Sequence, residues 1–108
     1  MRLILTVLFS IALGMTAATV SAAGDADKGK EKSAVCASCH GVDGNSTIPA
    51  NPRLAGQHAS YLLQALHDYK SGARKNPIMA GFAGTLSEED MQDLAAYFAS
   101  QSGLATPD

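Results

Sequence analysis

The sequence of 108 residues contains no tryptophan, only three phenylalanines, three tyrosines and two cysteines. With so few large aromatic side chains, the chain has little of the material that usually fills the core of a small domain. Two cysteines also exclude a scaffold held by several disulfides. Runs of β-branched residues with alternating polarity, which are typical of strands, are missing as well. The absence of any strand-like segment favours an all-α fold.

The chain also lacks an excess of charge of one sign. Its formal net charge is −2, and it has no basic stripe with interleaved aromatic residues. Proteins that bind nucleic acid use such a stripe to neutralise phosphates. We therefore expect no nucleic-acid partner.

The two cysteines occur together in the string Cys36-Ala37-Ser38-Cys39-His40. Two thiols three positions apart and followed by histidine are the attachment site of a c-type haem. In that chemistry each thiol forms a thioether with one haem vinyl group, and His40 binds the iron as proximal ligand. The motif predicts one covalently attached haem c.

Three other interpretations of this motif compete with haem attachment. A thioredoxin-like dithiol follows a strand, and no strand pattern precedes Cys36. A structural zinc site needs four ligands, and the spacing of His58 and His67 does not match one. A disulfide between Cys36 and Cys39 would close a very short loop and contribute little stability. Haem attachment is the interpretation that we favour.

Residues 1–23 have the layout of a cleaved secretory signal peptide. Arg2 precedes an apolar stretch at residues 3–13, and small residues at 20–23 suit cleavage after Ala22 or Ala23. The apolar stretch is shorter than the ~20 residues of a spanning helix. We expect export to the periplasm, no stable membrane insertion after cleavage, and one small haem-carrying domain at 24–108.

Three helices are predicted within that domain, separated by two long loops. The first spans 25–37 with Asp25 as N-cap, and the second spans 58–71 with Gly72 as its stop. The third begins at Ser87, with Asp90 at the N3 position of a capping box. A domain of about 85 residues buries little surface, so a covalently held porphyrin would be an important source of stability.

The ordered set of motifs resembles the class I cytochromes c. It is most similar to the short bacterial monohaem branch of the cytochrome c-553 kind, and to one half of the two-haem cytochromes c. The matching strings are Asp27-Lys28-Gly29-Lys30, Cys36 to His40, Pro52-Arg53-Leu54-Ala55-Gly56-Gln57, Asn76-Pro77-Ile78-Met79 and Leu94-Ala95-Ala96-Tyr97-Phe98. The resemblance implies the class I fold, with helices packed around one haem and a crossing of the first and last helices near Gly29.

The resemblance also implies a sixth iron ligand from a methionine before the last helix. We expect Met79 in this role, because Met91 lies on the apolar stripe of the last helix, whereas Met79 follows Pro77 in a segment expected to be irregular. His58 is a minor alternative. The resemblance further implies that the carbonyl of Pro52 accepts the Nδ1 hydrogen of His40, with Pro49 as a possible substitute.

An iron with both axial positions filled has no open site for oxygen, peroxide or substrate. The expected function is that of a soluble periplasmic electron carrier, not an enzyme, with a His40/Met79-ligated haem c. Its expected partners are a quinol-oxidising complex and a terminal oxidase or reductase. The alternatives are a five-coordinate haem sensor or peroxidase-like protein, and a haem subunit docked on a membrane oxidase.

Overall fold

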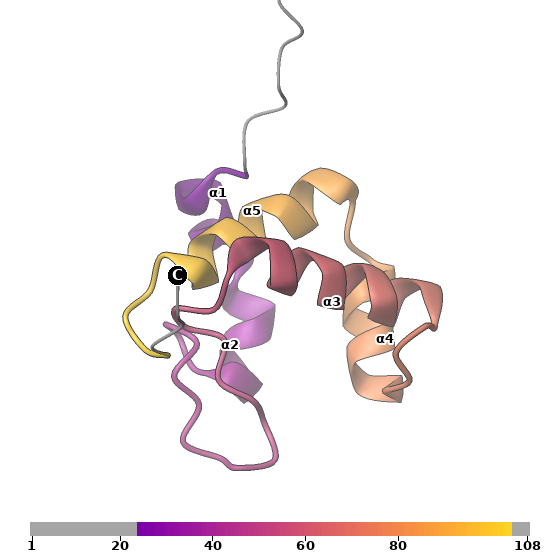
Figure 1. The fold of residues 1–108 in the computed structure, drawn as a ribbon, viewed down its shortest axis with the longest axis horizontal. Helices are drawn as coiled ribbons and strands as arrows, with labels where there is room; N and C mark the ends of the chain where they lie inside the picture. The colour runs from indigo at the N-terminus through magenta and orange to yellow at the C-terminus, as the bar shows by residue number, and fades with distance from the viewer. Residues whose placement is uncertain (1–23, 105–108) are drawn as a thin grey trace, which may run out of the picture.

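The computed structural model describes residues 24–104, so the predicted signal peptide at 1–23 lies outside the described residues. Within 24–104 the chain forms five helices and no strand, which confirms the all-α prediction (Figure 1). They are α1 (Ala26–Lys32), α2 (Ala34–His40), α3 (Ala59–Ser71), α4 (Pro77–Gly84) and α5 (Glu88–Ala99). In this same span no helix is both long and apolar enough to cross a membrane.

The first predicted helix, 25–37, is divided into two. Asp25 caps α1 as expected, with its carboxylate accepting hydrogen bonds from the N–H groups of Asp27 and Lys28. The helix ends because the hydroxyl and the N–H of Ser33 both bond to the carbonyl of Lys30, a local alternative to helix continuation that serine often provides. A new helix, α2, then carries the whole cysteine and histidine motif to His40.

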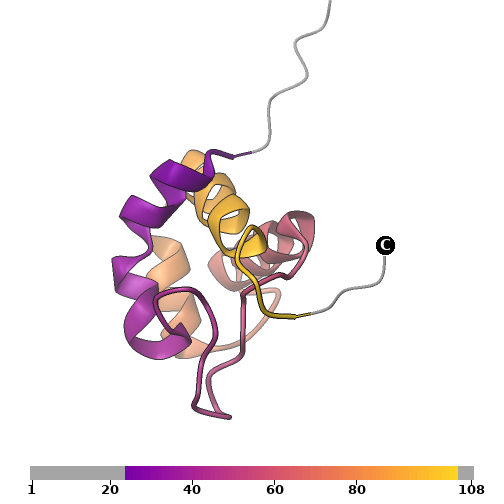
Figure 2. The same ribbon diagram turned by 90° about the vertical axis from the view of Figure 1, so that its left-hand side faces the viewer.

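The helices α1 and α5 pack against each other (Figure 2). Gly29 lies where α1 comes closest to Asp93 and Tyr97 of α5, as the resemblance implied. A Cβ atom added to Gly29 would lie 2.0 Å from the carbonyl oxygen of Asp93 and 2.8 Å from Cβ of Tyr97. No side chain fits at this distance. The glycine lowers the helix propensity of α1, and the close approach to α5 that it permits explains why it is there.

Two glycine-to-alanine substitutions should have opposite effects on stability. Gly29→Ala is expected to destabilise the haem-loaded protein by roughly 1–3 kcal/mol, because the helices must separate. Gly81→Ala in α4 is the matched control, since nothing lies within 4 Å of its Cβ position. It should stabilise the protein by roughly 0.5–1 kcal/mol. Urea unfolding measures both, and equal stability of Gly29→Ala and the parent would contradict the close crossing.

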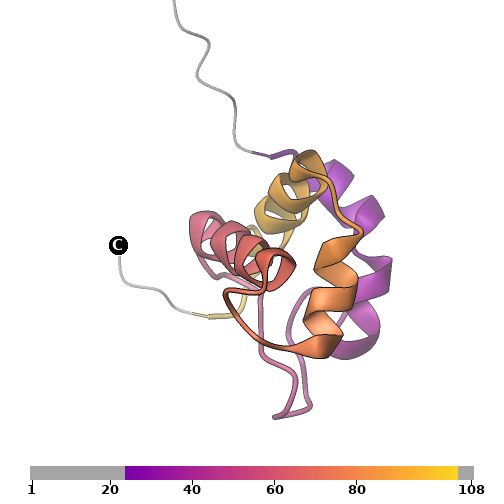
Figure 3. The same cartoon turned by 90° about the vertical axis from the view of Figure 1, so that its right-hand side faces the viewer.

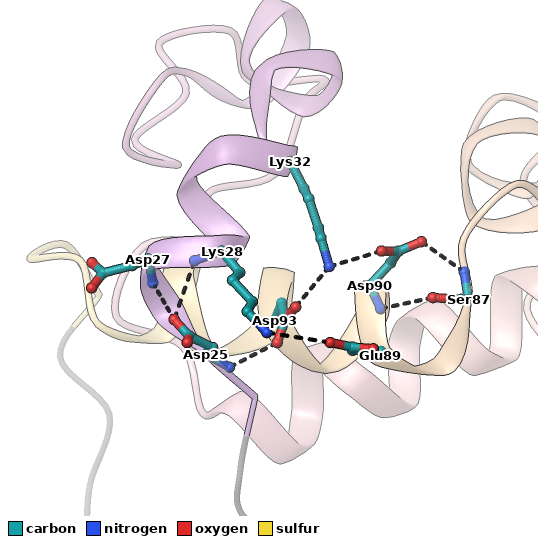
Figure 4. A network of polar contacts seen from close by, with 8 residues as sticks. All are labelled: Asp25, Asp27, Lys28, Lys32, Ser87, Glu89, Asp90 and Asp93. Atoms are coloured by element: carbon teal, nitrogen blue, oxygen red, sulfur yellow. Dashed lines mark hydrogen bonds and ion pairs between the residues drawn. The ribbon is translucent and has the colours of Figure 1, made fainter.

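An ion-pair network joins the same two helices (Figure 4). Nζ of Lys32 lies 2.9 Å from Asp90 and 2.7 Å from Asp93. Asp93 is buried, and its other carboxylate oxygen accepts the N–H of Asp25 at 2.8 Å. The hydrogen bond from Lys32 lowers the pKa of Asp90 to about 2 and also lowers the pKa of Asp93. The ion pairs of Lys32 therefore hold α1 against α5.

The predictions for the second and third helices are confirmed. His58 is the N-cap of α3, and Gly72 ends it in the left-handed conformation at φ 84°. Ser87 and Asp90 form the expected capping box, with two reciprocal hydrogen bonds of 3.0 Å. Both helices contribute to the hydrophobic core, which comprises Leu62, Leu94, Ala95, Tyr97 and Phe98.

One of the two predicted long loops is a loop, and the other is largely a helix. Residues 41–58 form no regular element and extend below the helices in Figure 1, tied to α5 by a 2.8 Å hydrogen bond from the Tyr97 hydroxyl to the carbonyl of Val42. The segment before α5, however, contains α4, which packs across α3 (Figure 3). The expectation that Met79 lies in an irregular segment is therefore wrong.

The signal for α4 is present in the sequence but local. Asn76 is its N-cap and Pro77 its first residue, which is the common way for a helix to begin. Sequence periodicity misses the helix because all of its residues are apolar or glycine, so that it shows no polar face and no helical repeat.

Candidate functional site

A cavity of about 290 Å³ opens between the helices and the 41–58 loop. Its walls come from α2, α3, α4 and α5, from the loop before α3 and from the segment between α3 and α4. Most of the lining is aliphatic or aromatic, and the lining polar groups are few. The residues that line it are Cys36, His40, Pro52, Arg53, Leu54, Gln57, Tyr61, Leu62, Ala65, Leu66, Tyr69, Arg74, Asn76, Met79, Leu94, Ala95 and Phe98.

His40 is the last residue of α2 and lies buried in the cavity wall. Its Nδ1 atom is 2.8 Å from the carbonyl oxygen of Pro52. A carbonyl can only accept, so Nδ1 carries the hydrogen, and in the neutral ring the Nε2 atom then has the lone pair. The ring is held in one orientation, with Nε2 available as a metal ligand. The carbonyl in this contact is that of Pro52 and not that of Pro49.

Both cysteines are half-buried thiols that form no disulfide with each other. Cys36 lines the cavity, whereas Cys39 is not among the lining residues. Burial is the main cause that raises the pKa of the Cys36 thiol, and the neighbouring Cys39 thiol raises it further. A redox-active dithiol needs the opposite, a nucleophilic cysteine with a lowered pKa. The electrostatics therefore do not favour the dithiol interpretation.

The two candidate methionines lie in different places. Met79 is half-buried on α4 and lines the cavity together with His40. Met91 is 3% exposed, lies on α5 and does not line the cavity. His58, the minor alternative, is an exposed N-cap residue and is also absent from the cavity wall. The cavity thus brings together one imidazole and one thioether.

Three residues of the cavity wall have a place in the site that the sequence did not predict. The guanidinium of Arg74 lies 4.9 Å from the centre of the Tyr69 ring, close enough for a cation–π contact. Asn76 caps α4 from the edge of the cavity. The Asn-Pro pair before Met79 was the available signal for Asn76, but no pattern in the sequence pairs Arg74 with Tyr69.

The residues of this cavity fit a haem c. The lining offers one imidazole with a free lone pair, one thioether and one thiol, which are ligand and attachment groups for this cofactor. Aliphatic and aromatic side chains around them suit a largely apolar macrocycle. Among the described residues no group of three or more His, Cys, Asp or Glu side chains is placed to hold a metal ion directly.

Comparisons with known proteins agree with this fit. The family model "Cytochrome c" matches residues 26–102. A cytochrome c4 of Pseudomonas aeruginosa is 50% identical over 100 residues, covering 90% of this chain and 49% of that protein. Cytochrome c-554(548) of Halomonas halodenitrificans is 44% identical over 82 residues, covering 73% of this chain and 99% of that protein.

The likeness extends to solved structures. Reduced recombinant cytochrome c4 from Pseudomonas stutzeri superposes with a TM-score of 0.72 at 49% identity, covering 76% of this chain and 48% of that one. The chain thus spans about half the length of the cytochrome c4 proteins that it matches. From the family match, the identities and the superposition, the chain belongs to the cytochrome c family, with the class I cytochrome c fold and haem c as its cofactor.

Proposed function

We propose that the protein is a periplasmic carrier of single electrons in which His40 and Met79 are the axial ligands of the haem iron. The observation that carries this proposal is that the His40 imidazole and the Met79 thioether line the same apolar cavity, beside Cys36. When bound there, haem c supplies a one-electron Fe(III)/Fe(II) couple.

Each site residue then has one role. Cys36 and Cys39 anchor the cofactor through thioethers, and His40 is the proximal ligand. The carbonyl of Pro52 fixes the His40 ring through the 2.8 Å contact with Nδ1 and increases the electron donation of the imidazole. Met79 would supply the second ligand of the haem iron from the α4 side of the cavity. No catalytic residue is proposed, because a site closed on both sides leaves no position for a substrate.

The surroundings of these ligands favour a high reduction potential. A neutral thioether ligand stabilises Fe(II) over Fe(III), and a water-poor apolar wall disfavours the extra positive charge of the oxidised state. Leu62, Leu94 and Phe98 form part of this wall and are themselves buried in the core. The potential should therefore lie in the upper part of the ~0.8 V range that axial ligands span.

Residues 1–23 support export as a signal peptide, and thioether attachment of haem c takes place on the far side of the bacterial inner membrane. We infer that a quinol-oxidising complex and a terminal oxidase or reductase are the electron donor and acceptor. The exposed side chains of Ile78 and Phe82 on α4, with Lys75 just before them, suit a small and salt-sensitive encounter of the kind typical of redox partners.

A mass spectrum of the exported protein, combined with a potentiometric titration, tests this function. We expect a chain that starts at Ala23 or Gly24, carries one haem through two thioethers, and titrates as a single one-electron couple at high potential. A Cys36→Ala variant that keeps Cys39 is the control and should lose one thioether. An exported chain that retains Met1, a mass without haem, or a potential near the bottom of the range would contradict the proposal.

A further inference from the structure

The side chain of Asn76 holds the backbone of Met79 directly. Its Oδ1 atom accepts hydrogen bonds from the N–H groups of Ile78 and Met79, both at 3.1 Å. Pro77, the first residue of α4, has no N–H group to satisfy. Asn76 therefore takes up the first two free donors of the helix, and one of them belongs to the residue that we propose as iron ligand.

The helix α4 packs across α3, but Pro77 and Ile78 in its first turn are exposed, and the helix itself has few features that fix where it begins. The helix has eight residues and no charged side chain, and it contains Gly81 and Gly84. Helices of this length are marginal without tertiary contacts, and each glycine lowers the propensity further. Only Ala83 is buried, near the far end, and both glycines face open space. The cap is thus a large part of what fixes the beginning of this helix.

The segment that leads into the cap is itself attached to α3. The N–H of Arg74 donates to the carbonyl of Asp68 at 3.0 Å, and its guanidinium lies over the Tyr69 ring. Arg74, Asn76 and Met79 all line the cavity. The chain is therefore held on α3 up to Arg74, and the cap of Asn76 determines the direction in which α4, with Met79, continues from there.

We propose that Asn76 is a positioning residue that keeps the sulfur of Met79 on the iron by capping α4. The inference rests on the proposed function, because it takes Met79 as the sixth ligand. With haem bound, Met79 would compete with any small ligand from solvent for the iron. Loss of the cap frees the first turn of α4 and lowers the fraction of time that the sulfur is in place, so an added ligand binds more tightly.

Imidazole binding to the ferric protein, followed in the visible spectrum, tests the proposal. Asn76→Ala should increase the affinity for imidazole about fivefold, which is a typical N-cap loss of about 1 kcal/mol converted at 1.4 kcal/mol per factor of ten. Asn76→Ser should stay close to the wild type, because serine is an equally good cap. The near-infrared sulfur-to-iron band should weaken in Asn76→Ala and be retained in Asn76→Ser.

Ser87→Ala is the matched control. Ser87 caps α5 through the N–H of Asp90 at 3.0 Å, away from the cavity wall. Its loss should lower the midpoint of thermal unfolding about as much as Asn76→Ala does, with imidazole affinity unchanged. If Asn76→Ala lowers that midpoint but leaves the affinity and the band as they are, Asn76 is a structural cap only and the inference is overturned.

Two further outcomes distinguish the role of Asn76 from that of Met79. If Asn76→Ala does not fold, Asn76→Gly, a slightly weaker cap than serine, should bind imidazole more tightly than Asn76→Ser, and equal affinities would overturn the inference. If Met79→Ala binds imidazole no more tightly than the wild type, Met79 is not the ligand. That result contradicts the proposed function itself, and the role proposed for Asn76, which depends on it, is then also wrong.

Discussion

Replacing both Cys36 and Cys39 with alanine should leave the protein without haem and largely unfolded. In the described residues no large side chain is completely buried, and the cavity of about 290 Å³ would lose its cofactor. An empty apolar cavity costs about 24 cal/mol per Å³, which sets an upper limit of ~7 kcal/mol for this one. That is comparable with the roughly 5–15 kcal/mol by which whole domains are stable. The haem is therefore expected to decide whether the chain folds.

Circular dichroism measures this outcome directly. The double variant should show little helix and no cooperative melt, while Ser38→Ala, which keeps both thiols on the same helix, should bind haem and melt as the wild type does. Native-like helicity with a cooperative melt in the haem-free double variant would show that the polypeptide core suffices. The haem would then not be what decides folding.

The parts of the fold that the sequence predicted are those with local determinants. The capping box of Ser87 and Asp90 and the C-terminal Gly72 each act within one turn of helix, so their residues are close in the sequence as well as in space. The break at Ser33 is also local, but a serine inside a helical pattern ends a helix only sometimes. The helix α4 was missed because apolar periodicity, the main signal, requires a polar face that α4 lacks.

The residues of the site likewise differ in whether a local sequence pattern predicts them. The attachment motif is contiguous, so Cys36, Cys39 and His40 could be proposed from spacing alone. The contact of His40 with Pro52 and the place of Met79 on the cavity wall were expected from a resemblance, since no local rule links them. Outside the site, the pairing of Lys32 with Asp93, 61 residues apart, and the contact of His67 with Glu88 at 2.6 Å depend on helix packing. Neither could be foreseen from the sequence.

Separate replacement of Met79 and Met91 by alanine should show which of the two is the iron ligand and which is a core residue. Met79→Ala is expected to abolish the near-infrared sulfur-to-iron band, to lower the potential by a substantial part of the ~0.8 V range, and to open the reduced iron to carbon monoxide. The reason is that removal of the thioether leaves one axial position without a protein ligand. Absorption spectra, redox titration and carbon monoxide binding at neutral pH measure the three effects.

Met91→Ala is the control, because Met91 is buried on α5 and does not line the cavity. It should cost roughly 2–5 kcal/mol of stability, as other truncations of core methionines do, and leave the visible and near-infrared spectra unchanged. A band that survives in Met79→Ala and disappears in Met91→Ala would reverse the assignment. If the unmutated protein already binds carbon monoxide readily, the iron is five-coordinate, and a haem sensor or peroxidase-like protein takes the place of the electron carrier.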